Sequence, residues 1–195
     1  MPALMSTRLI PREPEAQPTL FDVAMAQRWK YVERVKADPD RMIPGESIFQ
    51  PADLAATAHY VDDFIANAKY VLLKSESLEA LQKLADIIYD EMDVWFLDEI
   101  LELYPAAKNE EERITAIGLT ALAAPGAMDP RFLEILKAAY SASEPRVREK
   151  AVRMTAYVGW PELLAQLTPL QNDPDEKVRD RASAVVAAMT QRPTG

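Results

Sequence analysis

A recurring spacing of 31 residues in the C-terminal half constrains this chain more than any single motif does. Val147 and Arg148 are followed at that distance by Val178 and Arg179, and Arg113 precedes Arg148 by 35 residues. The offset of 31 also relates Pro130 to Pro161, Leu133 to Leu164, Leu136 to Leu167, and Ala151 to Ala182. Because the spacing is kept over two successive helix-like segments, it predicts a repeated pair of helices.

The passage before the last helix contains a strong start signal. Asp173 has a capping carboxylate, Pro174 suits the first helical position, and Glu176 completes a capping-box spacing. Residues 37–51, with three prolines and a glycine, are expected to form an irregular connection. Periodicity along the chain predicts helices at 20–37, 52–73, 76–91, 93–104, 110–124, 129–141, 145–158, 161–171 and 174–190.

Composition favours a helical structure for the whole chain. Hydrophobic residues make up 49% of the 195 residues, and the chain contains only 5 glycines. Its Ala/Leu/Glu-rich runs outnumber its clusters of β-branched residues, which favours helices over strands. We therefore predict an all-α fold, a short right-handed α-solenoid with an N-terminal helical cap. Its expected parts are a disordered Pro-rich tail at 1–18, the helical cap at 19–73, and repeats at 74–195 that end in a half repeat.

The motif Asp-Pro-x-x-x-Val-Arg at 173–179, with Ala182 one turn further on, resembles the start of the second helix of a HEAT repeat. A shorter version at Pro145, Val147 and Arg148 is similar to the lyase-type HEAT-like repeats. The resemblance covers about residues 76–190 and implies a concave face that binds another macromolecule.

The same resemblance implies polar contacts between neighbouring repeats. Glu144 and Asn109 stand four rather than six residues before their arginines, which departs from a regular ladder of aspartate and arginine. The structural contacts between repeats are expected at Asp173, Arg179, Arg148 and Arg113.

Catalytic patterns are missing from the sequence. Cysteine is absent, which excludes disulfides, thiolate metal sites and cysteine nucleophiles. The single histidine, His59, stands one helical turn from Asp63 in the predicted helix, but a metal would need further ligands that this neighbourhood does not supply. No glycine-rich phosphate loop or nucleophile elbow is present. We therefore predict a protein that is not an enzyme and has no cofactor or metal.

Targeting and membrane signals are also missing. No run approaches the roughly 20 apolar residues that span a bilayer, and the N-terminal residues do not have the pattern of a signal peptide. A membrane partner is therefore not expected, and the cytoplasm is the expected compartment.

The acidic residues are concentrated in one segment. Residues 76–112 contain twelve acidic residues against Lys83 and Lys108, a local net charge of −10, whereas the whole chain has −9. Residues 131–153 have six basic and three acidic residues. Such a potential repels phosphates and attracts a basic protein or peptide, so nucleic acid is not the expected partner.

The predicted helix 93–104 lies within the acidic segment. Helical spacing places a core stripe on one side of it, at Phe96, Leu97, Ile100, Leu101 and Tyr104. The opposite side is predicted to bind the partner through Trp95, Asp98, Glu99 and Glu102. The alternative is that Trp95 packs under the N-terminal helices and that the acidic side chains only form a solvated face.

These observations favour a non-enzymatic binding protein whose acidic concave surface engages a basic protein or peptide. An immunity or inhibitor protein against a cationic toxin fits this electrostatic pattern. A scaffold or adaptor subunit is an alternative. The resemblance adds two more, a HEAT-like DNA-binding or DNA glycosylase protein and a bilin lyase-like enzyme.

Overall fold

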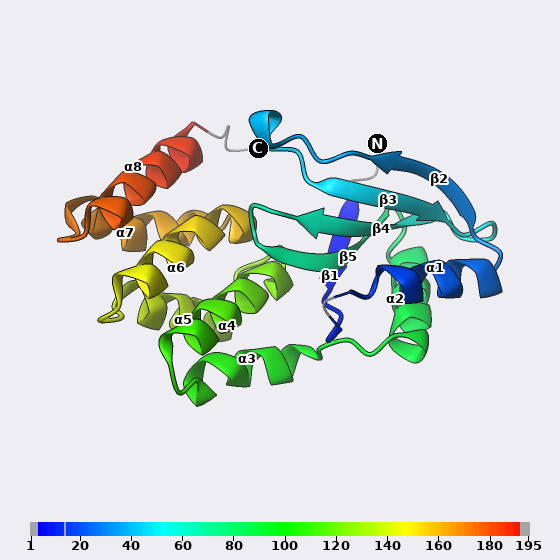
Figure 1. Ribbon diagram of the computed structural model, residues 1–195, viewed down its shortest axis with the longest axis horizontal. Coiled ribbons are helices and arrows are strands. Elements are labelled where there is room, and N and C mark those ends of the chain that lie inside the picture. Colours follow the sequence, from blue (N-terminus) through cyan, green and yellow to red (C-terminus); the bar gives the residue numbers. More distant parts are fainter. Residues whose placement is uncertain (1–3, 14, 192–195) are drawn as a thin grey trace. The chain divides into compact units, whose positions relative to one another are not determined.

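The computed structural model describes residues 4–13 and 15–191, and the chain divides into two compact units, Met1–Trp95 and Phe96–Gly195 (Figure 1). Within the described residues, the first unit is built on a five-stranded antiparallel sheet with the order β1-β5-β4-β3-β2. Its strands are β1 (Met5–Leu9), β2 (Lys30–Val35), β3 (Gly45–Gln50), β4 (Ala56–Asp63) and β5 (Ala68–Ser75). The unit also contains α1 (Gln17–Ala26), the 3₁₀ turn η1 (Pro39–Arg41) and α2 (Leu78–Glu91).

Both helices of the first unit pack on one face of the sheet. Ser77 is the N-cap of α2, and its hydroxyl accepts a hydrogen bond from Ala80 N. On α1, the Phe21 ring meets the Phe49 ring of β3 edge to face, with centroids 4.8 Å apart. The shared core consists of alternate residues of the strands and one side of each helix, including Leu20, Val23, Phe49, Ala58, Tyr60, Val71, Leu73, Leu81, Leu84 and Ile88.

The prediction of an all-α solenoid with a helical cap is wrong, because the segment expected to be the cap contains β2 to β5. For the same reason, the description of the chain as an α-solenoid of HEAT repeats is wrong. The helix predicted at 52–73 is the β4–β5 hairpin. β4 is buried along most of its length on both faces, so it lacks the alternation of apolar and polar residues that identifies a strand.

Two other expectations for this unit differ from the structure. The helix predicted at 20–37 ends at Ala26, and Arg28, at φ 55°, turns the chain into β2. Residues 5–9 of the expected tail form β1 and pair with β5, while residues 1–3 and 14 lie outside the described residues.

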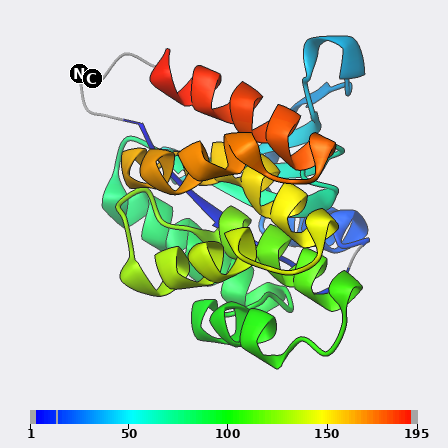
Figure 2. The same cartoon turned by 90° about the vertical axis from the view of Figure 1, so that its left-hand side faces the viewer.

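The second unit is helical throughout its described elements. Its main helices are α3 (Leu97–Ala106), α4 (Glu110–Ala123), α5 (Pro130–Tyr140), α6 (Pro145–Val158) and α8 (Glu176–Thr190). Between α6 and α8 lie three short elements, η2 (Pro161–Leu163), α7 (Leu164–Leu167) and η3 (Thr168–Asn172). α4 packs on α6 and α6 packs on α8, and Figure 2 shows the helices following one another from α3 to α8. From residue 110 onward, these elements lie within a few residues of the predicted helices.

Local signals account for the helix ends in this unit. Asn109 and Asp129 accept hydrogen bonds from the first turns of α4 and α5, and Gly159, at φ 70°, ends α6. Within the core, the Tyr140 hydroxyl is 2.6 Å from Thr155 Oγ1, and Trp160 Nε1 donates to Pro125 O at 3.0 Å. Both buried polar groups are therefore satisfied.

Asp63 holds the turn between β4 and β5. Its Oδ1 accepts hydrogen bonds from Ile65 N and Ala66 N at 2.9 Å, and its Oδ2 accepts one from the Tyr70 hydroxyl at 3.2 Å. The carboxylate is buried, so these donors replace the water that it loses.

We expect Asp63→Ala to lower the free energy of unfolding by about 2–4 kcal/mol, because it leaves two backbone N–H groups and a buried hydroxyl without an acceptor. Urea unfolding at neutral pH measures the change. Asp53→Ala, at an exposed site in the β3–β4 loop, should change it by less than about 0.5 kcal/mol. Equal losses in the two variants would contradict this role of Asp63.

Candidate functional site

Trp95 is not on the helix that carries the acidic residues with which it was predicted to act. Trp95 is half-buried in the first unit and precedes α3, which begins at Leu97. Its backbone N donates to Ile10 O at 2.9 Å. The Arg12 guanidinium lies over its ring, with Cζ 4.0 Å from the ring centroid, and pairs with Asp93. The Trp95 ring therefore already holds a cation from its own chain.

The start of α3 exposes apolar side chains that were predicted to be core. Phe96 is 57% exposed and Leu97 is 37% exposed, while Ile100 and Leu101 are buried. The difference arises because the helix begins at Leu97, so Phe96 is the N-cap residue and not part of the helical stripe. Glu99 marks this start, since its carboxylate accepts a hydrogen bond from Phe96 N at 2.9 Å. Acidic residues at 98 and 99 are the sequence signal that would have placed the boundary here.

The exposed carboxylates of α3 differ in whether they have an ion-pair partner. The Asp98 side chain is 88% exposed and lies 3.1 Å from Arg131 Nη1, which also pairs with Asp129. Glu102 is exposed, and no hydrogen-bond or ion-pair partner is found for it in the described part of the chain. We call the exposed side chains of this region the α3 patch; its members are Phe96, Leu97, Asp98, Glu99 and Glu102.

Many other acidic residues of the segment 76–112 are engaged within the protein. Glu110 and Glu111 both pair with Arg146, at 3.0 and 2.6 Å. Glu112 accepts hydrogen bonds from Lys108 N and Asn109 Nδ2 at the start of α4. These carboxylates stabilise helix ends and neighbouring helices, so the count of acidic residues overstates the charge available to a partner.

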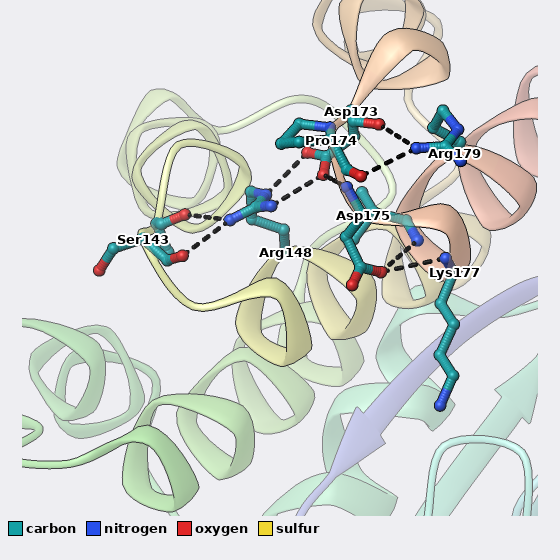
Figure 3. Close-up of polar contacts among 9 residues, drawn as sticks. Ser143, Arg148, Asp173, Pro174, Asp175, Lys177 and Arg179 are labelled. Carbon is teal, nitrogen blue, oxygen red and sulfur yellow. Dashed lines mark hydrogen bonds and ion pairs between the residues drawn. The ribbon is translucent and has the colours of Figure 1, made fainter.

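Arg148 and Asp173, two of the residues expected to make contacts between repeats, form a buried bidentate ion pair between α6 and the turn before α8 (Figure 3). Arg148 Nε and Nη2 donate to the two Asp173 oxygens at 2.7 and 2.8 Å. Arg148 Nη1 donates to Ala142 O and Ser143 O. The hydrogen bonds from Arg148 lower the pKa of Asp173 below its ordinary value. All three guanidinium nitrogens are thus occupied, and the pair joins elements rather than offering a charge to a ligand.

Arg179 repeats part of this arrangement, because its Nη1 donates to Asp173 O and Pro174 O, six and five residues earlier. Arg113 pairs with Glu144 of the next helical pair. Asp173 does not cap α8 as predicted, because Asp175 is the N-cap. Asp175 accepts a hydrogen bond from Lys177 N, as Figure 3 shows, and another from Val178 N. Asp173 is used by Arg148 instead.

His59 is buried on β4 in a line of polar groups that the helical prediction did not foresee. Its Nδ1 is 2.8 Å from Glu46 Oε2, and its Nε2 is 2.9 Å from Thr57 Oγ1. The hydrogen bond with His59 lowers the pKa of Glu46. Asp63, the predicted neighbour, has its carboxylate in the β4–β5 turn, because four residues along a strand span about 13 Å rather than one helical turn. Among the described residues, no cluster of three or more His, Asp or Glu side chains is arranged to hold a metal.

Comparison with protein-family models, with curated proteins and with solved structures gives no match for this chain. Of the helices in the described ranges, none has the length and apolar character that crossing a membrane requires.

We expect Asp173→Asn to lower the free energy of unfolding by about 3 kcal/mol at neutral pH, because it leaves the buried Arg148 guanidinium uncompensated. The lowered pKa of Asp173 means that its contribution is present above the ordinary value of 3.8 and is lost as pH falls through the lowered value. The difference between the variant and the wild type should therefore narrow as the pH falls below the ordinary value of 3.8.

Urea unfolding at several pH values tests this expectation. Asp175→Asn is the matched control, since asparagine caps a helix as well as aspartate does. A pH-independent difference for Asp173→Asn would show that the charge of Asp173 does not carry the effect.

Proposed function

We propose that the protein is a non-enzymatic binding module that engages a basic protein or peptide through the α3 patch. The observation that carries this proposal is the exposure of Phe96 and Leu97 beside carboxylates at the start of a helix. Ile100 and Leu101 anchor α3 in the core, so the start of the helix presents these side chains on a fixed support. Trp95 is no longer part of the proposed surface.

The apolar part of the patch supplies the contact area. Two adjacent large apolar side chains, Phe96 and Leu97, are exposed, and covering them removes apolar surface from water. Single exposed apolar residues are common on proteins, but a contiguous pair bordered by polar residues is the composition of an interaction site.

The acidic part of the patch favours a partner with positive charge. Glu102 is exposed without a partner in the described residues, and Asp98 is almost fully exposed despite its contact with Arg131. A lysine or arginine of a partner gains mainly from Glu102, and the net charge of −9 steers a basic partner toward the molecule. An inhibitor of a cationic protein and an adaptor in a complex would both use this recognition.

Affinity capture from an extract of the native host cells, followed by mass spectrometry, is the test. We expect the wild type to retain a basic protein, with a steep loss of binding as salt rises. Glu102→Lys should weaken the binding of that protein roughly tenfold or more. Phe96→Ser should weaken the binding of the same protein, because it removes apolar contact. Isothermal titration of the captured protein measures both effects, and unchanged thermal stability shows that the variants are folded.

Glu162→Lys is the matched control, because Glu162 is an exposed acid of the second unit outside the α3 patch. It changes the net charge by the same amount as Glu102→Lys and should leave binding nearly unchanged. A captured partner that is acidic, or one that all three variants bind equally well, would overturn the proposal.

A further inference from the structure

The first unit contains a pocket of about 310 Å³ where the first turn of α1 meets one end of the sheet. Strand register brings its polar side chains together. Arg34 pairs with Ser47, and Ser47 pairs with Tyr60, so the three stand in one row across β2, β3 and β4 on the same face. Gln17 of α1 lies over this row, since its Nε2 donates to Ser47 Oγ at 3.2 Å. The polar lining is Gln17, Arg34, Lys36, Glu46, Ser47, Tyr60 and Asp62.

Tyr60 carries an unsatisfied donor into this pocket. It is only 3% exposed, and no acceptor for its hydroxyl proton is found within the described structure. Tyr70 and Tyr140 are also buried, but their hydroxyls bond to Asp63 and Thr155. A buried hydroxyl without a partner is a cost to the folded state, which a ligand that accepts its hydrogen bond would remove.

The protonation state of Tyr60 suits this role. Burial raises the pKa of its hydroxyl, and Lys69 and the backbone of Gln17 oppose that rise only in part. The group is therefore neutral near pH 7 and can donate to an oxygen of a ligand.

The other groups around the pocket favour a negative charge. Arg34 and Lys36 are exposed at its edge, and neither has an ion-pair partner among the residues that the structure describes. α1 begins there without a side-chain cap and without an acidic residue in its first turn. Asp62 and Glu46 are the acidic residues of the lining, and the Glu46 carboxylate is held by His59.

We propose that this pocket binds a small organic anion with a carboxylate or phosphate group. Arg34, Lys36 and the start of α1 hold the charge, and the Tyr60 hydroxyl donates a hydrogen bond to an oxygen of the ligand. The volume lies at the lower end of the range for metabolite pockets, which limits the ligand to a small molecule. This site is separate from the α3 patch and does not depend on the function proposed for it.

Two probes distinguish the sources of the anion: succinate for carboxylates and inorganic phosphate for phosphates, with potassium chloride at equal ionic strength as the reference. Amide chemical shifts of the full-length protein are followed during titration. We expect saturable shifts at Gln17, Ser47 and Tyr60 with one probe at least. Tyr60→Phe should weaken that binding roughly fivefold, and Arg34→Gln, at an exposed position that tolerates substitution, should weaken it further.

Thermal unfolding separates a binding role of Tyr60 from a structural one. Without a probe, Tyr60→Phe should raise Tm because it removes an unpaired buried hydroxyl, while the rise in Tm caused by the probe should shrink. Tyr31→Phe, at an exposed tyrosine of β2 outside the pocket lining, is the control and should change neither quantity. No saturable shift with either probe, or a Tyr60→Phe protein that binds as the wild type does, would overturn the proposal.

Discussion

β4 is buried on both of its faces, and the first unit is arranged around that constraint. The strand lies at the centre of the sheet, with β5 on one side and β3 on the other. A strand in this position must either bond each polar group it carries or lose the hydration energy of that group. His59 meets the requirement through Glu46 and Thr57, whereas Tyr60, the next residue and on the opposite face, does not. The burial of β4 thus leaves hydrogen-bonded polar side chains on one face and the Tyr60 hydroxyl, a donor without an acceptor in the described residues, on the other.

Arg148 and Asp173 have the corresponding role in the second unit. Each is more than nine-tenths buried, and removing two charges from water is costly unless every remaining donor and acceptor is used. Arg148 meets this condition through the planar fork that matches a carboxylate and through two backbone carbonyls. Arg179 makes the same carbonyl contacts 31 residues later. The spacing in the sequence therefore reflects a way of fastening the turn before each helix, which is a structural requirement and not a site of chemistry.

The helices of the second unit could be predicted because their signals are local. Asn109 and Asp129 cap their helices, and a 3.6-residue period runs through each core side. The sheet could not be predicted in the same way, since a strand buried on both faces and a buried helix have similar composition, and only Asn67 in a left-handed turn marks the β4–β5 hairpin. For the candidate site, the acidic residues of α3 followed from charge counting. The roles of Trp95 and Phe96 did not, because α3 begins at Leu97 and not at Asp93, and this difference of four residues leaves both side chains before the helix.

The α3 patch sets limits on how a basic partner can bind. Over a screening length of about 8 Å at physiological salt, the charges next to a contact matter more than the net charge of the chain. Arg131 already lies against Asp98, so a partner cation placed there has to share that carboxylate or displace Arg131, and gains little. Glu102 has no such competitor in the described residues, and a cation placed beside it gains the full, though modest, surface attraction. Tight binding then requires that Phe96 and Leu97 be covered at the same time, because apolar burial supplies affinity where exposed charges mainly supply orientation and association rate.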